Sequence, residues 1–112
     1  MFAKTYRLRA KKDFDALWKR GKSVHGQALG IKYSLNNLGG PRIGVVVSTK
    51  IHKRSVQRNL IRRRIREALR REYVPKIKNF DIVVIAKNNI VGQKYAKISE
   101  DLGFVFKKAG LI

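Results

Sequence analysis

The order of periodic segments along the chain predicts an α/β protein, a two-layer sandwich in which helices pack on one face of a small mixed β-sheet. Short β-branched segments alternate with segments that repeat apolar residues at helical spacing. A strongly basic helix stands between two apolar strands, so it would be the crossover that joins them. No internal repeat or low-complexity linker interrupts residues 1–112, which predicts a single domain.

The N-terminal part begins with a short basic stretch, residues 1–9, which we expect to be a tethered arm. Residues 12–20 then place Phe14, Leu17 and Trp18 at the i, i+3, i+4 spacing of a helix with an aromatic face. From periodicity alone, the three side chains are best interpreted as core residues. Because lysine and arginine flank them, they could equally form a floor on which unpaired bases stack.

The sheet is predicted from three segments. Apolar residues alternate with other residues over 24–35, which indicates a strand with one buried side, and a glycine-rich loop leads to a nearly all-apolar strand over 43–48. We expect these two strands to pair as an antiparallel hairpin. Residues 80–86 are short and β-branched, which predicts a buried strand. Apolar residues at helical spacing from residue 95 to Gly110 predict a last helix that lies on the sheet.

The segment 50–72 separates apolar and cationic side chains most clearly. With Ser55 as a possible N-cap and about 100° per residue, one side of a helix can be buried; it carries Ile61, Ile65, Ala68 and Leu69. The adjoining side collects Arg58, Asn59, Arg62, Arg66 and Arg70. A charge run is most often a solvated face, but such faces mix signs, and like charges four residues apart repel. Since guanidinium groups suit bidentate phosphate contacts, the expected neighbour is a polyanion.

The composition supports a nucleic acid as that polyanion. The chain has 27 Lys and Arg against 7 Asp and Glu, a formal net charge of +20, which favours a nucleic acid or an anionic membrane surface. Membrane binding needs a broad exposed apolar face, whereas the apolar side of the basic helix can join the core, so no membrane partner is expected. The sequence has no cysteine, no secretory segment and no apolar run of bilayer length, and we expect a cytoplasmic protein.

The titratable residues are not arranged for catalysis. The acidic residues offer no convincing metal-binding pair, and Asp13 and Asp15 would lie on different faces of their helix. His25 and His52 are the only histidines and are better explained as surface residues than as a general acid–base pair. Residues 39–41 lack the Lys-Ser or Lys-Thr of a phosphate-binding loop. We therefore expect no catalytic and no metal-binding residue in the polypeptide.

Residues 53–66, KRSVQRNLIRRRIR, resemble the RNR signature of the bacterial ribonuclease P protein family. The positions that match the pattern are Arg58, Asn59, Ile61, Arg62, Arg63 and Arg66. Leu60 stands where Arg is common in the family, and Ser55 stands where Ala is usual. The resemblance extends through nearly the whole chain, to Arg7-Leu8, Asp13-Phe14, Trp18, Gly21, residues 43–48 with Lys50, and residues 80–86.

The resemblance implies a protein subunit of the ribonucleoprotein enzyme that removes the 5′ leader of precursor tRNA. The RNA subunit and its Mg²⁺ ions would perform the hydrolysis, and the partners would be ribonuclease P RNA and precursor tRNA, with no obligate protein partner. It also implies a left-handed crossover through the basic helix in place of the usual right-handed one. Residues implied to contact the catalytic RNA are Lys50, Lys53, Arg54, Arg58, Asn59, Arg62, Arg63, Arg66 and Arg70.

A cleft between the first helix and the sheet is the family's track for the single-stranded leader. The aromatic residues assigned to it are Phe14, Trp18 and Tyr33, which leaves Leu17 as a core residue. Two other functions stay open on the sequence alone. A structural rRNA-binding protein of ribosomal type would share the charge and size, and a self-sufficient nuclease would use His25 or His52.

Overall fold

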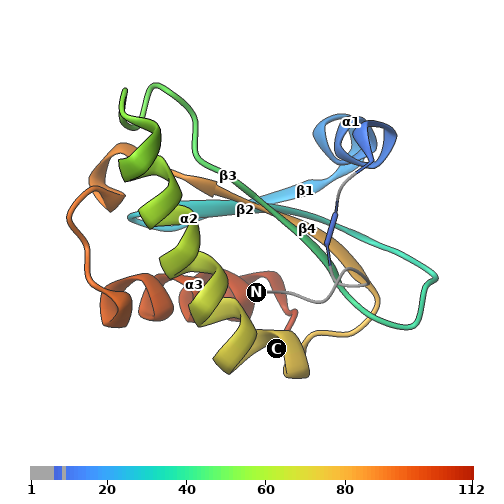
Figure 1. Ribbon diagram of the computed structural model, residues 1–112. Helices are drawn as coiled ribbons and strands as arrows, with labels where there is room; N and C mark the ends of the chain where they lie inside the picture. Colours follow the sequence, from blue (N-terminus) through green and yellow to red (C-terminus); the bar gives the residue numbers. More distant parts are fainter. Residues whose placement is uncertain (1–6, 9) are drawn as a thin grey trace.

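The computed structural model describes residues 7, 8 and 10–112 (Figure 1). The expected N-terminal arm, residues 1–9, therefore lies mostly outside the described residues. Of its two described residues, Arg7 forms an isolated parallel β-bridge with Ile43, and Leu8 is buried. No helix within the described ranges is long and apolar enough to cross a membrane.

The predicted α/β class, a small mixed sheet with helices packed on it, is confirmed. In chain order the elements are α1 (Lys11–Arg20), β1 (Lys22–His25), β2 (Leu29–Leu35), β3 (Arg42–Val46), α2 (Ser55–Ala68), a π-helical turn (Leu69–Tyr73), a 3₁₀ turn (Val74–Lys76), β4 (Phe80–Ala86), a 3₁₀ turn (Asn88–Ile90) and α3 (Tyr95–Ala109). The strand order is β1-β2-β4-β3. Since β3 and β4 are parallel, α2 is the crossover that joins them, as predicted. The left-handed sense of this crossover stays a prediction.

Two strand predictions are wrong. The segment 24–35 contains the end of β1, a tight turn and β2, because Gly26 donates its N–H to the carbonyl of Leu29 (2.8 Å) and reverses the chain. β2 and β3 do not form a hairpin, because β4 lies between them and pairs with both. Residues on both faces of β4 are fully buried, including Ile82 and Val83, and such a strand belongs in the middle of a sheet.

The main core lies where α2 and α3 cover one face of the sheet. Alternate residues of β4, Ile82 and Val84, share this core with Ile65 of α2 and Phe106 of α3, and all four are completely buried. Burying side chains of this size stabilises a fold by about 1.5–3 kcal/mol each. The last helix therefore lies on the sheet as predicted, and it ends at Gly110, whose positive φ of 77° forms the left-handed C-cap.

α1 packs on the opposite face of the sheet, so the helices do not all share one face as predicted (Figure 1). Leu17 of α1 is 2% exposed and packs with Leu8 and Val83, which confirms it as a core residue. Val83 and Val84 are neighbours in β4 and point to opposite faces, because side chains alternate along a strand. α1 does not fill this face, because a pocket of about 120 Å³ remains open there beside Lys32 and Ile85.

α2 begins at Ser55, but this serine is not its N-cap. Arg54 occupies that position without a side-chain capping bond, and the first turn contains no acidic residue. The guanidinium of Arg58 instead donates through Nη1 to the carbonyls of His52 (2.9 Å) and Lys53 (2.8 Å). The loop before α2 is thus held by an arginine of the helix itself.

Candidate nucleic-acid interface

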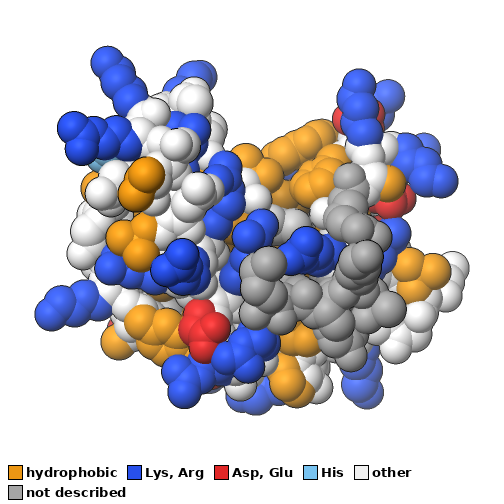
Figure 2. Space-filling model, viewed as in Figure 1, with side chains coloured by type: hydrophobic (Ala, Val, Ile, Leu, Met, Phe, Trp, Pro, Cys, Tyr) orange, Lys and Arg blue, Asp and Glu red, His pale blue; other side chains and the backbone are white. Residues whose placement is uncertain are grey.

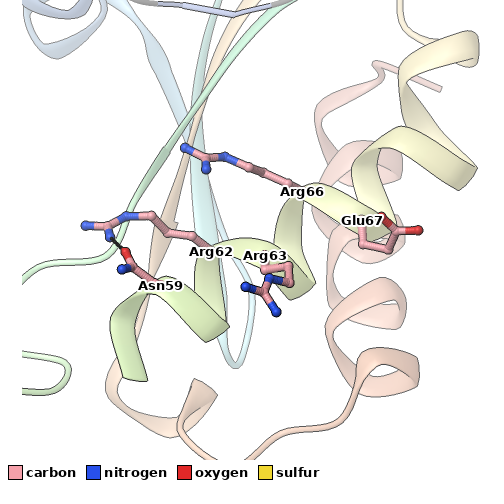
Figure 3. Close-up of a pocket in the computed structure, with 5 residues that line it drawn as sticks. All are labelled: Asn59, Arg62, Arg63, Arg66 and Glu67. Atoms are coloured by element: carbon pink, nitrogen blue, oxygen red, sulfur yellow. Dashed lines mark hydrogen bonds between the residues drawn. The ribbon is translucent and has the colours of Figure 1, made fainter. Parts of the chain in front are cut away.

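The cationic side of α2 borders the edge strand β3 and the residues that follow it. Arg62 donates through Nη2 to the carbonyl of Val47 (3.3 Å) and through Nη1 to the side-chain oxygen of Asn59 (2.7 Å). Figure 3 shows Arg62 and Arg66 extending from α2 in a similar direction, with Asn59 beside Arg62. A pocket of about 490 Å³ lies along this side; its lining residues are Asn59, Arg62, Arg63, Arg66 and Glu67. We call it the arginine groove.

The electrostatics of the groove favour an anion. Burial lowers the pKa of the half-buried Arg66, and the positive charges of Arg7 and Arg62 lower it further. Figure 2 shows Lys and Arg side chains gathered over α2 and continuing toward α1. Since these cations repel one another, a phosphate placed among them would relieve the repulsion as well as form charge-assisted hydrogen bonds.

The loop before α2 adds exposed cations at the N-terminal end of the groove helix. Lys50, Lys53 and Arg54 are all exposed there. His52 is half-buried, and its Nδ1 accepts the backbone N–H of Arg54 (3.1 Å), so this histidine shapes the loop. Arg58 was predicted to contact RNA, and in the structure its Nη1 holds the same loop.

Arg70 is separated from the groove by an acidic partner. Its Nη2 lies 2.6 Å from the carboxylate of Glu67, and it belongs to the π-helical turn that follows α2. The hydrogen bond from Arg70 is the main reason why the pKa of Glu67 lies below its usual value. Of the predicted RNA-binding residues, the structure thus brings Asn59, Arg62, Arg63 and Arg66 together, while Arg70 is engaged within the protein.

The predicted aromatic cleft is only partly correct. Phe14 packs on the α1 face of the sheet against Gly44, and Trp18 is 42% exposed on the same helix. Tyr33 lies on the opposite face, because it is paired with Ile82 and packs against the main core. The centre of its ring lies 6.2 Å from the centre of the Phe80 ring, in an edge-to-face arrangement. The prediction that Tyr33 lines a cleft with the other two aromatics is therefore wrong.

Lys32, the neighbour of Tyr33 in β2, occupies the position that was expected for Tyr33. Its Nζ donates to the carbonyl of Trp18 (3.1 Å) and lies 5.6 Å from the centre of the indole ring. Beside it is a small, mostly apolar pocket of about 120 Å³; its lining residues are Ser23, His25, Gly30, Ile31, Lys32, Ile85 and Lys87. We call Trp18, Lys32 and this pocket the sheet platform. The sequence carries one signal for this choice, the alternation of side chains along a strand, because only one of Lys32 and Tyr33 can face α1.

The two surfaces define a class of protein. An arginine groove suits phosphates, and an exposed indole beside a lysine suits unpaired bases. Across the described ranges, no three His, Cys, Asp or Glu side chains come together as a metal site. The fold and its surfaces are those of a small α/β protein that binds a single-stranded or folded nucleic acid.

Comparison with known proteins defines the family. The family model Ribonuclease P matches residues 2–110, and the chain belongs to this family. The ribonuclease P protein component of Clostridium kluyveri is 37% identical over 108 residues, which cover 95% of this chain and 96% of the relative. That of Streptococcus agalactiae serotype III is 36% identical over 109 residues, covering 97% and 98%.

Solved structures agree with this assignment. The ribonuclease P protein of Staphylococcus aureus has a TM-score of 0.84 at 31% identity, covering 95% of this chain and 96% of that one. The Thermotoga maritima protein has a TM-score of 0.82 at 30% identity, covering 91% and 96%. The chain is therefore a protein subunit of ribonuclease P, its partner is the ribonuclease P RNA, and a structural rRNA-binding role is not supported.

Proposed function

We propose that the protein binds ribonuclease P RNA through the arginine groove and the loop before α2, and the 5′ leader of precursor tRNA through the sheet platform. The observation that carries this proposal is the position of the two surfaces on either side of β3. Arg62 reaches the carbonyl of Val47 just after β3 from the α2 side, and Phe14 packs on Gly44 of β3 from the α1 side. The arginine groove and the sheet platform, on either side of β3, can therefore hold two RNAs at once.

The charge of the protein explains why such a subunit helps an RNA enzyme. A polyanionic catalyst and a polyanionic substrate repel each other, and a protein of charge +20 between them lowers that repulsion. Each cation that neutralises a phosphate also releases counterions. Stacking of an unpaired base on an aromatic ring contributes about 1–3 kcal/mol and tolerates any base. Such tolerance suits a subunit that handles many leaders.

We further propose that the hydrolysis depends on Mg²⁺ and that the RNA subunit holds most of this ion. Because the described residues offer no cluster of His, Cys, Asp or Glu that fits the ion, we assign the protein no step that runs through the metal. Its part is to bind and orient the two RNAs. We further propose that the protein works in the cytoplasm, as its RNA partners imply.

Reconstitution tests the proposal directly. We expect the protein to restore leader removal by ribonuclease P RNA at a low Mg²⁺ concentration, and to cut nothing when the RNA is left out. Arg62→Ala should weaken association with the RNA subunit, whereas Trp18→Ala should weaken affinity for precursor tRNA relative to mature tRNA. Lys78→Ala, an exposed cation outside both surfaces, is the matched control.

Three results would refute the proposal. Cleavage by the protein alone would place the chemistry on the polypeptide. Failure to stimulate the RNA would remove the holoenzyme role. If Trp18→Ala weakened binding of mature and precursor tRNA equally, the sheet platform would not be the leader site.

A further inference from the structure

The exposed surface of α3 next to the β1–β2 turn carries an aromatic side chain without an assigned role. Phe104 is 53% exposed, and the Nζ of Lys108 lies 5.7 Å from the centre of its ring. A hollow of about 180 Å³ opens beside the ring; its lining residues are Gln27, Lys97, Glu100, Asp101 and Phe104. An exposed aromatic ring among lysines is the arrangement on which unpaired bases stack.

This surface is continuous with the sheet platform through one residue, Gly26. On one side, the Nζ of Lys87 from the platform pocket donates to the carbonyl of Gly26 (2.8 Å). On the other side, a Cβ placed on Gly26 would lie 3.8 Å from the ring of Phe104. A strand of RNA that crosses the platform and rounds this turn therefore meets Phe104 next.

The turn that joins the two surfaces is held firmly. Asp101 is only 4% exposed and accepts the backbone N–H of Ala28 (3.1 Å), and the Nζ of Lys97 donates to the side-chain oxygen of Gln27 (2.9 Å). The backbone N–H of Lys87 also donates to the carbonyl of Ala28 (3.0 Å). The relative position of platform and Phe104 is therefore fixed before RNA binds.

The local charge fits an RNA backbone. The Nζ of Lys97 lies 3.8 Å from the exposed carboxylate of Glu100 and 3.5 Å from the carboxylate of Asp101, so its charge is balanced within the protein. Lys107 and Lys108 are exposed on the same helix. Asp101 is buried and already paired within the protein. The remaining net charge is positive around the aromatic ring, which favours phosphates on either side of a stacked base.

We propose that Phe104 and its lysines form a second stacking site for the upstream nucleotides of a long 5′ leader, reached after the leader has crossed the sheet platform. This proposal rests on the leader-binding function of the platform. It makes the affinity for precursor tRNA rise again once the leader is long enough to round the β1–β2 turn. Phe104 is then a binding residue for long leaders only.

The test uses the reconstituted holoenzyme and a series of precursor tRNAs whose leaders are lengthened one adenosine at a time. We expect Phe104→Ala to weaken binding of the long-leader substrates by about fivefold or more, as the loss of one base–aromatic stack predicts. The loss should disappear below a threshold leader length. Trp18→Ala should weaken binding of short and long leaders alike.

Further variants decide what Phe104 contacts. Phe104→Trp should keep the wild-type affinity for long-leader substrates. Phe104→Leu keeps apolar area without an aromatic face, so it should bind these substrates as weakly as Phe104→Ala. Leu38→Ala removes another exposed apolar side chain, from the β2–β3 loop, and should change nothing. Wild-type affinity of Phe104→Ala for every leader, or of Phe104→Leu for long ones, overturns the proposal. If Trp18→Ala also has no effect on any leader, the proposal that the sheet platform binds the leader is refuted as well.

Discussion

Two arginines show how their surroundings divide the cations of this protein into structural and binding groups. Arg42 donates to Asp81 (2.8 Å) and Asp13 (3.0 Å), and the hydrogen bond to Asp81 is the largest cause that raises its pKa. Arg66 has its pKa lowered by burial and by neighbouring positive charges. A cation with carboxylate partners stabilises the fold. A cation crowded by other cations is instead stabilised when it binds a phosphate.

Tyr33 provides a prediction at the same scale. Tyr33→Ala should lower the free energy of unfolding by at least about 1 kcal/mol, because the ring packs on the main core and an aromatic pair of this kind contributes about 0.5–1.5 kcal/mol beyond its buried area. Chemical denaturation measures the loss. Affinity for precursor tRNA, measured on the folded fraction, should stay at the wild-type value. A selective loss of leader affinity without a loss of stability would return Tyr33 to the binding surface.

Helix α1 depends on a close contact with the sheet. A Cβ on Gly44 would lie 2.7 and 2.9 Å from two carbons of the Phe14 ring, so only glycine lets this ring pack so closely on β3. The ion pair between Arg42 and Asp13 fixes the same helix at its first turn. The position of Trp18 over Lys32 follows from these two contacts.

Gly44→Ala should therefore displace α1 and weaken leader binding. We expect the affinity for precursor tRNA to fall while the affinity for the RNA subunit is kept, and overpacking to cost about 1–3 kcal/mol of stability. Phe14→Leu in the same protein should recover part of the stability, because it removes ring atoms that the new methyl group would meet. Unchanged stability and leader affinity in Gly44→Ala would show that α1 is not seated through this contact.

A carboxylate at the joint between the end of α2 and α3 predicts a sensitivity to acid. Glu72 accepts hydrogen bonds from the hydroxyls of Ser99 and Tyr95, and the bond from Ser99 is the largest cause that lowers its pKa. A carboxyl whose pKa is lowered by folding stabilises the native state above its ordinary pKa. That contribution is lost as the pH falls through the folded-state pKa.

Glu72→Gln should remove this dependence. We expect the variant to be less stable than wild type near neutral pH, and the difference to close as the pH falls below the ordinary glutamic acid value of 4.5. Urea unfolding at a series of pH values measures it. A constant difference across the acid range would show that the hydrogen bonds to the carboxylate do not contribute to stability.

At the scale of the whole molecule, charge sets two opposite responses to salt. The net charge of +20 is confined to a body with a radius of gyration of 12.9 Å, close to the Debye length of about 10 Å at 0.1 M salt. Added salt should therefore raise the free energy of unfolding by screening self-repulsion. It should also lower the affinity for RNA, with a slope of roughly −0.7 to −0.9 per phosphate contact on logarithmic axes.

Thermal unfolding and RNA binding measured over one salt series check both responses. Arg63→Ala should reduce the salt slope by about one contact, because this exposed residue lines the arginine groove. An RNA affinity that did not change with salt would mean that the groove does not bind phosphates.

The sequence by itself determined the helices, the buried strand over 80–86, the family and most of the groove residues. These follow from local periodicity, from residue type and from a motif confined to residues 53–66. The side that α2 buries is set by 3.6-residue periodicity, and its cations then fall on the adjoining side whatever the rest of the chain does.

Only the tertiary structure decided the strand order, the face covered by α1 and the choice of Lys32 over Tyr33 for the platform. Alternation along a strand separates two faces but does not say which face meets which helix. That choice depends on pairing between segments far apart in the chain, as when β4 enters between β2 and β3 and sets the register of both.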